Sequence, residues 1–279
     1  MNINTNVAAM RAASASHRAG LQAAKARASL STGVRIASSA DGAAELSVAD
    51  RMTAQIRGMQ QSVRNLSDGA ALAQTAMGLL DEMTNMMQRV RELAVQASSA
   101  TYGEADRAAM NEEAQILNNN FSKLLFNSEY NGSPLFGKIE PGPPSANYNL
   151  WTHIGVTIQA GANANETIEA QFYGPMGSFV DLTNVAQLPQ TLDDLDQGLK
   201  DLSHTAATFG AFQNRLESAM EVVSSGVVNL MDARSRIVDA DYSEETSALA
   251  KQQILQQSSL AMLAQAQMTP KNVLTLLKS

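Results

Sequence analysis

Apolar side chains recur along two long stretches of this chain at steps that alternate between four and three residues. The first stretch begins at Met52 and continues through Ile56, Met59, Val63, Leu66, Ala70, Ala73, Met77 and Leu80. The second begins at Leu192 and continues to Ile237. A sustained pattern of this kind is typical of a helix whose narrow apolar seam is covered by partner helices. The sequence therefore predicts two long helices, over about 43–99 and 189–238.

Polar and small residues interrupt both predicted helices. Gln213 and Arg234 occupy seam positions of the second helix, either because the seam meets solvent there or because polar residues fix the helix register. Gly58, Gly69 and Gly78 lie inside the first helix, where a glycine costs up to about 1 kcal/mol relative to alanine. These glycines indicate either the close approach of a neighbouring helix or plain tolerance. The pattern alone leaves both questions open.

A third helix is predicted between the two long ones. Thr101 and Glu104 match a capping box, in which the first side chain caps the helix and the second reaches back to it. Apolar side chains follow at the same spacing from Met110 to Leu124, and an Asn-Gly turn signal stands at 131–132. Three helices that share apolar seams form a bundle.

A β-hairpin is predicted at about 151–173. Apolar residues alternate with polar or small ones over 154–158 and again over 168–172, on either side of a turn at 161–165. A lone hairpin is marginally stable in water. We therefore expect its apolar face to lie on the helices.

The two ends of the chain predict weaker helices. Residues 1–35 and 243–279 are diluted with Ala, Ser and Gln, and Pro270 is expected to interrupt the second helix. Such segments bury too little apolar surface to stay folded alone, so we expect neighbours to order them. Their apolar positions are the candidate assembly residues: Ile3, Val7, Met10, Leu21, Leu255, Leu263, Leu274 and Leu277.

These elements predict a mainly α fold, namely a long-helix coiled-coil bundle with a small β-hairpin. The helical-bundle domain would span 43–238. The terminal segments 1–42 and 239–279 would pair as a second coiled-coil layer. Long coiled-coil proteins of this kind are structural components more often than enzymes.

Composition and charge narrow the function further. The 279 residues include no cysteine, which excludes disulfides and thiol chemistry. A net charge of −7 argues against a general nucleic-acid binder. Residues 1–40 nevertheless carry five basic side chains and no acidic one, either as a solvated face or as an electrostatic partner surface. The sequence shows neither a secretory signal nor an apolar stretch long enough to insert into a membrane.

No arrangement of side chains typical of catalysis is found. His17, His153 and His204 are not at metal-ligand spacing from one another. Four carboxylates spread around the start of a predicted helix, where carboxylates are favoured in any case: Asp193, Asp194, Asp196 and Asp201. The sequence therefore predicts no enzyme activity, no bound metal and no cofactor.

Several separate stretches resemble the bacterial flagellin family. Their order and spacing carry the resemblance: Ile-Asn-Thr-Asn at 3–6, Leu-Ser-Thr-Gly-Val-Arg-Ile at 30–36, Asn-Leu-Ser-Asp-Gly at 65–69, Gln-Arg-Val-Arg-Glu-Leu-Ala-Val-Gln at 88–96, Gln-Asn-Arg-Leu at 213–216, Ala-Arg-Ser-Arg-Ile at 233–237, Asp-Ala-Asp-Tyr at 239–242, Gln-Ile-Leu-Gln-Gln at 253–257 and Asn-Val-Leu at 272–274. The resemblance implies a structural subunit of the helical flagellar filament used for swimming. It also implies that outer variable domains are absent, since the flanking helices lie close together in sequence.

The resemblance implies partners and a location as well. The partners are other copies of the chain, a flagellar export chaperone, the filament cap, hook-associated junction proteins and host Toll-like receptor 5. The receptor contact would consist of Gln88, Arg89, Leu93 and Glu113, although Arg89 and Leu93 are also candidates for plain packing between subunits. The protein would be extracellular and exported without a cleaved signal peptide.

Two other interpretations stay open. A hook–filament junction protein shares related terminal helices and layout, but the 88–96 stretch and the 239–242 region favour a flagellin. A soluble helical binding module that uses the hairpin surface is the more distant alternative.

Overall fold

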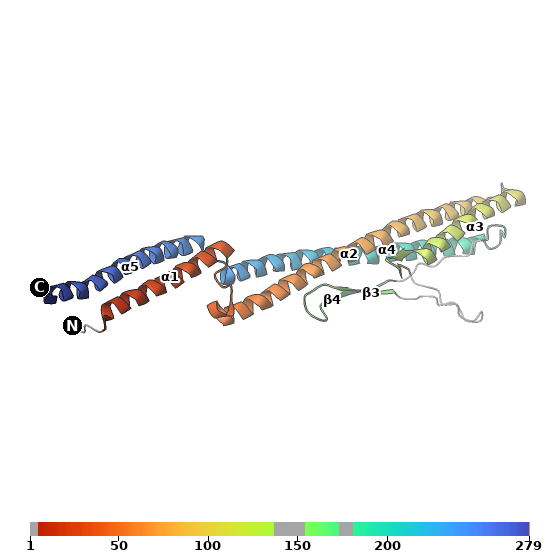
Figure 1. Ribbon diagram of the computed structural model, residues 1–279. Helices are drawn as coiled ribbons and strands as arrows, with labels where there is room; N and C mark the ends of the chain where they lie inside the picture. The colour runs from red at the N-terminus through yellow and green to blue at the C-terminus, as the bar shows by residue number, and fades with distance from the viewer. Residues whose placement is uncertain (1–4, 137–153, 173–180, 279) are drawn as a thin grey trace. The chain divides into compact units, whose positions relative to one another are not determined.

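The computed structural model describes residues 5–136, 154–172 and 181–278, with side chains up to residue 268. In these ranges the chain forms five helices and two small antiparallel hairpins. The helices and the hairpin β3–β4 are labelled in Figure 1. The elements are α1 (Val7–Thr32), α2 (Ser39–Ala97), α3 (Glu104–Asn127), β1 (Glu129–Tyr130), β2 (Ser133–Pro134), β3 (Ile154–Gln159), β4 (Thr167–Phe172), α4 (Leu188–Val238) and α5 (Tyr242–Lys278). The mainly α fold with a small β-hairpin is confirmed.

The chain forms two compact units. The first unit comprises Met1–Gln55 and Val228–Ser279, and the second comprises Ile56–Val227. The first turns of α2 and the last turns of α4 thus belong with the terminal helices, whereas the sequence placed the borders after residues 42 and 238. Arg234 on α4 illustrates why, since its Nε donates to Thr53 Oγ1 on α2 at 2.8 Å within the first unit.

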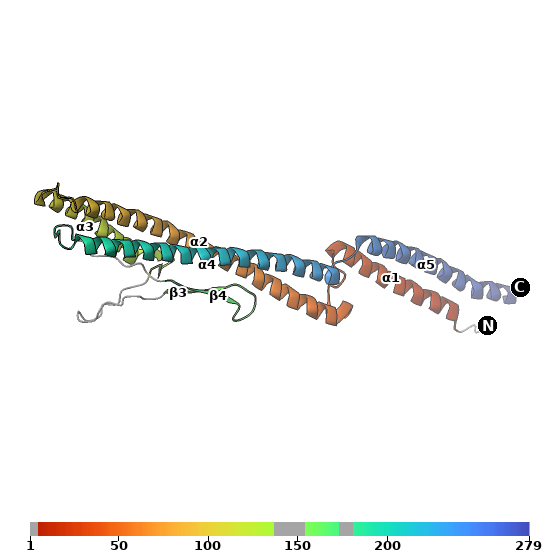
Figure 2. The same cartoon turned by 180° about the vertical axis from the view of Figure 1, so that it is seen from behind.

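In the first unit, α1 and α5 pair side by side and run antiparallel, as the two views show (Figures 1 and 2). α1 ends at Gly33, whose φ of 71° is a left-handed conformation that glycine adopts freely. A single β-bridge joins Val34 to Asp239, and Ala240 N donates to the Gly33 carbonyl at 2.9 Å. These bonds hold the end of α1 beside the start of α5. We refer to α1 and α5 together as the terminal pair.

Pro270 does not interrupt α5, so that expectation was wrong. The helix runs without a break from Tyr242 to Lys278. Proline has no N–H, so the carbonyl of Ala266, four residues earlier, loses its helical donor. The side chain of Asn6 replaces that donor, because its Nδ2 lies 2.7 Å from the Ala266 oxygen.

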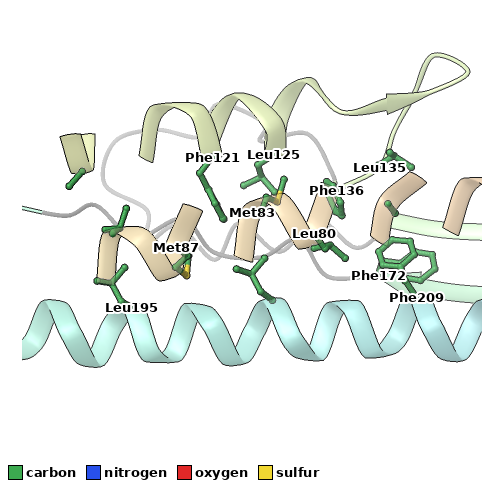
Figure 3. Packing of buried hydrophobic residues seen from close by; sticks show 14 of the residues in the cluster. Leu80, Met83, Met87, Phe121, Leu125, Leu135, Phe136, Phe172, Leu195 and Phe209 are labelled. Atoms are coloured by element: carbon green, nitrogen blue, oxygen red, sulfur yellow. The ribbon is translucent and has the colours of Figure 1, made fainter. Parts of the chain in front are cut away.

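The core of the second unit lies where α2, α3 and α4 meet. In Figure 3 the α2 residues Leu80, Met83 and Met87 lie between α3 and α4. Leu80 and Met83 are fully buried, and the facing helices contribute Phe121 and Leu195, each about 2% exposed. The seam positions predicted on α2 and α4 are buried or half-buried along their whole length. Apolar side chains from three helices therefore form one continuous core.

The hairpin β3–β4 packs on the helices through apolar side chains. Val156 pairs with Ala170 and Ile158 with Ile168 across the two strands. At its end, Phe172 stacks on Phe209 of α4, with ring centroids 3.7 Å apart and planes 2° apart (Figure 3). The second unit thereby includes the hairpin in its core.

Of the glycines Gly58, Gly69 and Gly78 in α2, the first two permit this packing. A Cβ on Gly58 would lie 2.9 Å from the Ala162 Cβ in the hairpin turn. A Cβ on Gly69 would lie 3.1 Å from Leu216 and 3.2 Å from Ile158. Gly78 has nothing within 4 Å, so it is merely tolerated. The neighbour that needs Gly58 is thus the hairpin and not another helix.

α3 begins differently from the sequence expectation. Its N-cap is Gly103, and Glu104 is the first helical residue. Asp106 replaces Glu104 in the reciprocal bond, since its Oδ2 accepts from Gly103 N at 3.0 Å. Thr101 instead forms a hydroxyl contact with Ser99 at 2.7 Å, within the turn that precedes the helix. The predicted N-cap, Thr101, was therefore wrong, because the observed N-cap is Gly103, two residues later.

The two polar seam residues of α4 behave differently. Arg234 bonds across the seam to Thr53, which supports a role in fixing the register of α2 and α4. Gln213 bonds within its own helix, since its Nε2 donates to Glu217 Oε1 at 2.8 Å. A bond inside one helix fixes no register.

Candidate functional site

α1 turns its small residues toward α5 and its larger apolar residues to solvent. Its buried side chains are all small: Ala19, Ala23, Ala26 and Ser29. Val7, Met10 and Leu21, three of the predicted assembly residues, are 47%, 65% and 60% exposed. Small side chains let two helices approach closely, but they remove little apolar surface from water. The apolar stripe that the sequence shows on α1 is thus not the face that meets α5.

α5 is arranged in the same way. Leu255 is 44% exposed and Leu263 is half-buried. Five further large apolar side chains of α5 are more exposed than Leu255: Tyr242, Ile254, Leu260, Met262 and Met268. Both helices of the terminal pair thus leave large apolar side chains in water. Of the remaining assembly candidates, Ile3 lies outside the described residues, and the side chains of Leu274 and Leu277 are not described.

The 88–96 stretch lies on α2 and places its predicted residues in two environments. Gln88 and Arg89 are exposed, and so is Glu113 on α3. Arg89 bridges the two helices, because its guanidinium lies 2.8 Å from Glu113 Oε1 and 3.0 Å from Glu92 Oε2. Leu93 is only 2% exposed and belongs to the core. The structure therefore joins Arg89 to Glu113 on the surface, leaves Gln88 exposed next to Arg89 in sequence, and buries Leu93 in the core.

The ion pairs of Arg89 raise its pKa above the ordinary arginine value. The largest cause is the hydrogen bond to Glu113, followed by the bond to Glu92. All three side chains are about half exposed or more, so water screens the pairs and each contributes little to stability. What the pairs provide is a fixed position for the guanidinium at the surface.

Sequence reasoning missed a second ion pair close to this surface. Arg91 Nε lies 2.6 Å from Asp196 Oδ1, and Arg91 NH2 donates to Oδ2 at 3.3 Å, so α2 and α4 are joined by a two-pronged contact. The hydrogen bond from Arg91 lowers the pKa of the Asp196 carboxyl. Asp196 was interpreted only as part of an acidic helix start. Helical spacing shows which face a residue occupies, but it does not show which residue of another helix lies opposite.

Within the described ranges, no group of three His, Asp or Glu side chains is placed to hold a metal ion. Among these same residues, no helix is both long and apolar enough to cross a membrane.

Comparisons with protein families match both ends of the chain. Residues 3–140 match the model of the bacterial flagellin N-terminal helical region. Residues 192–277 match the model of the bacterial flagellin C-terminal helical region. The matched ranges contain the terminal helices and the 88–96 stretch.

Curated relatives match along the whole chain. The flagellin of Halalkalibacterium halodurans is 37% identical over 289 residues, and the flagellin of Bacillus subtilis is 34% identical over 306 residues. The flagellar filament 33 kDa core protein of Treponema phagedenis is 33% identical over 286 residues. Each alignment covers 100% of both chains.

Among solved structures, Bacillus cereus flagellin is similar with a TM-score of 0.49 and 23% identity, covering 61% of this chain and 94% of that one. Nothing in the family and sequence matches favours the junction protein over the filament subunit. The full-length identity and the two family matches agree with the helices and hairpin described above. The chain belongs to the bacterial flagellin family and is a structural subunit of the flagellar filament.

Proposed function

We propose that copies of this chain assemble through the exposed apolar stripes of the terminal pair. The observation that supports the proposal is the arrangement of α1, which buries Ala19, Ala23 and Ala26 and exposes Met10 and Leu21. A helix pair that hides small side chains and shows large ones gains stability when further helices cover it. Repeated head-to-tail contacts that do not close into a ring give an open helical polymer.

Point variants test this proposal without trimming the chain. Met10→Ser and Leu21→Ser change exposed side chains, so the isolated subunit should keep its helix content. We expect the double variant to leave much less polymer than the unaltered chain when assembled subunits are pelleted. Ile116→Ser on α3 is the matched control, because Ile116 is 62% exposed and lies in the other unit. Equal polymer yield from the double variant and the control would refute assembly through this stripe.

We infer a recognition function for the surface formed by Gln88, Arg89 and Glu113, with Toll-like receptor 5 as the partner. The family resemblance suggests the partner, and the fixed, exposed guanidinium of Arg89 supports the site. Leu93 would act indirectly, by supporting the surface from the core. Subunits in a filament would hide this surface, so the monomer would be the form that binds.

A receptor-reporter assay with purified monomer tests the recognition function. Arg89→Ala should reduce activation strongly, because charged anchors dominate such contacts. Arg64→Ala is the matched control, since Arg64 is an exposed arginine on the same helix that bonds to Gln61. A full response to the Arg89 variant would refute the inference. The absence of any response to the unaltered monomer would refute it as well.

We further propose that the protein reaches the extracellular filament without losing N-terminal residues. The support is Asn6, which caps α1 through Ala9 N at 3.0 Å and bonds to Ala266. Cleavage beyond residue 6 would remove both bonds. Mass spectrometry of subunits from intact filaments would test the proposal, since a shortened N-terminus would contradict it.

The export chaperone, the filament cap and the junction proteins are proposed partners on the resemblance alone.

Members of the flagellin family are structural proteins rather than enzymes. We propose that this chain likewise has no catalytic activity and needs no cofactor, metal ion, nucleic acid or membrane insertion. Polymer yield that is unchanged by a metal chelator would agree with this proposal.

A further inference from the structure

One face of α1 combines apolar side chains with arginines that have no acidic partner in the described part of the chain. A groove of about 370 Å³ opens on this face and is lined by Thr5, Val7, Met10, Arg11, Ser14 and Arg18. Arg18 donates only to the carbonyl of Ser14 in its own helix, at 3.4 Å. No acidic residue occurs in residues 1–40, so neighbours in sequence cannot neutralise these guanidiniums. The groove is therefore exposed, apolar and cationic.

The start of α5 has the opposite character. Glu244 and Glu245 lie in its first turn, and neither forms an ion pair in the structure as described. Tyr242 next to them is 58% exposed. Asp241 adds a third carboxylate, whose Oδ1 accepts from Ser243 N at 2.8 Å. An exposed aromatic ring and three carboxylates thus lie within five residues, and we refer to 241–245 as the acidic start of α5.

The groove and the acidic start cannot meet within one chain. Tyr242 donates its hydroxyl to the Leu30 carbonyl at 2.7 Å, which fixes the acidic start beside the end of α1. At 1.5 Å per residue, Arg18 lies about 18 Å from Leu30 along α1, and Arg11 lies further still. An arginine side chain cannot span that distance. The two charged surfaces therefore lie at opposite parts of the terminal pair, and each is unpaired in the single subunit.

We propose that the groove on α1 of one copy binds the acidic start of α5 of a second copy. Complementary charge selects this occupant, since two guanidiniums face three carboxylates, and Tyr242 supplies an apolar ring for Val7 and Met10. Each copy carries one groove and one acidic start, so the contact repeats head to tail and extends a polymer. The inference rests on the proposed assembly through the terminal pair and adds a register and a direction to it.

Two charge-reversal variants test this contact. Arg11→Glu with Arg18→Glu makes the groove acidic, and Glu244→Arg with Glu245→Arg makes the start of α5 basic. Each variant alone then presents like charges at every contact. The concentration needed for polymerisation should rise by about tenfold or more for each variant, because like charges in an interface are repulsive.

Mixing the two variants in equal amounts gives the decisive result. In the mixture every groove can meet a start of opposite charge, so long polymers containing both variants should form. A variant that merely fails to fold could not be rescued in this way. Arg57→Glu with Lys123→Glu in the other unit makes the same change in net charge as the groove variant and should polymerise normally.

Two outcomes separate this inference from the assembly proposal itself. If the unaltered chain polymerises but both reversed variants polymerise equally well alone, the contact is wrong and assembly through the apolar stripes stands. If both variants stay monomeric when mixed, the contact is also wrong. If the unaltered chain does not polymerise, the assembly proposal fails first.

Discussion

Asn6 donates a hydrogen bond to the carbonyl of Ala266 in α5. Pro270 has no N–H, so it leaves this carbonyl without its helical donor. The Asn6 Nδ2 to Ala266 O distance is 2.7 Å, and the same side chain caps α1 by accepting from Ala9 N at 3.0 Å. One asparagine therefore satisfies a backbone group on each helix of the terminal pair. Because only one carbonyl of α5 is freed in this way, the bond also specifies the register in which α1 and α5 pair.

Asn6→Ala should weaken the terminal pair. It removes a helix cap, which contributes about 1 kcal/mol, and leaves the Ala266 carbonyl without a protein donor. We expect faster amide exchange in α5 around Ala266 by about fivefold to thirtyfold, measured by mass spectrometry on the monomer. Amides in the core of the other unit, such as that of Leu80, serve as the internal reference and should not change.

Asn6→Asp separates the two bonds. Aspartate still caps α1 but offers only acceptors to Ala266, so it should lose the contact with α5 and keep the cap. Adding Pro270→Ala restores the helical donor and should recover most of the protection in the aspartate variant. If Pro270→Ala gave no recovery, the coupling between Asn6 and Pro270 would be disproved.

Substitutions at the glycines of α2 should have opposite effects. Gly58→Ala places a methyl group 2.9 Å from Ala162 and should destabilise the second unit by about 1–3 kcal/mol, because the hairpin turn must move. Gly78→Ala meets nothing within 4 Å and should stabilise the helix by up to about 1 kcal/mol. Urea unfolding of the two variants measures both effects. If both substitutions changed the free energy of unfolding in the same direction, the packing of the hairpin on Gly58 would be contradicted.

Acid should weaken the bond that ties α1 to the start of α2. Asp41 Oδ1 lies 2.8 Å from Lys25 Nζ, and its hydrogen bonds to Lys25 and Ser38 lower the pKa of the carboxyl from 3.8 to about 2. A carboxyl whose pKa is lower in the folded state stabilises the fold above the unfolded pKa. This contribution is therefore complete above about pH 4 and is lost as the pH falls toward 2.

Thermal unfolding of the first unit between pH 6 and pH 2 checks this dependence. Asp41→Asn should unfold at a lower temperature than the unaltered chain at pH 6, and the difference should shrink as the pH approaches 2. Asp50→Asn, which removes another carboxylate of α2, is the control. If this difference in unfolding temperature grew as the pH fell, it would contradict a lowered pKa of Asp41 in the folded state.

The ion pair between Arg91 and Asp196 should contribute to stability and not to receptor recognition. Both side chains are about 40% exposed, so water screens the pair, and a double-mutant cycle with Arg91→Ala and Asp196→Ala should give a small favourable coupling. Arg91→Ala should leave receptor activation by the monomer unchanged, unlike Arg89→Ala. Equal loss of activation in both variants would place the recognition surface elsewhere.

The helices could be predicted from the sequence because apolar spacing reports helical faces directly. The seams of α2 and α4, from Met52 and from Leu192, are buried or half-buried as expected. The spacing on α1 is equally regular at Val7 and Met10, yet these side chains face solvent. A pattern identifies an apolar face, but it does not say whether the same chain or another copy covers it.

The features that the sequence did not reveal have a common physical cause. Pro270 has no partner in its own helix, and only the fold brings Asn6 to the carbonyl it frees. The resemblance names Leu93 for the receptor contact, and only the fold shows that its side chain lies in the core. Arg91 and Asp196 are 105 residues apart in sequence and meet only because α2 and α4 pack. Contacts between distant segments depend on register, which local spacing does not determine.

If the terminal helices drive assembly, electron microscopy of seeded monomer should show it. Purified full-length subunit and a version lacking 1–35 and 243–279 would each be mixed with short filament fragments. We expect long uniform filaments from the full chain and none from the trimmed chain, which should still fold its α2–α3–α4 core. Filaments from the trimmed chain, or a full chain that stays monomeric, would contradict assembly through the terminal helices.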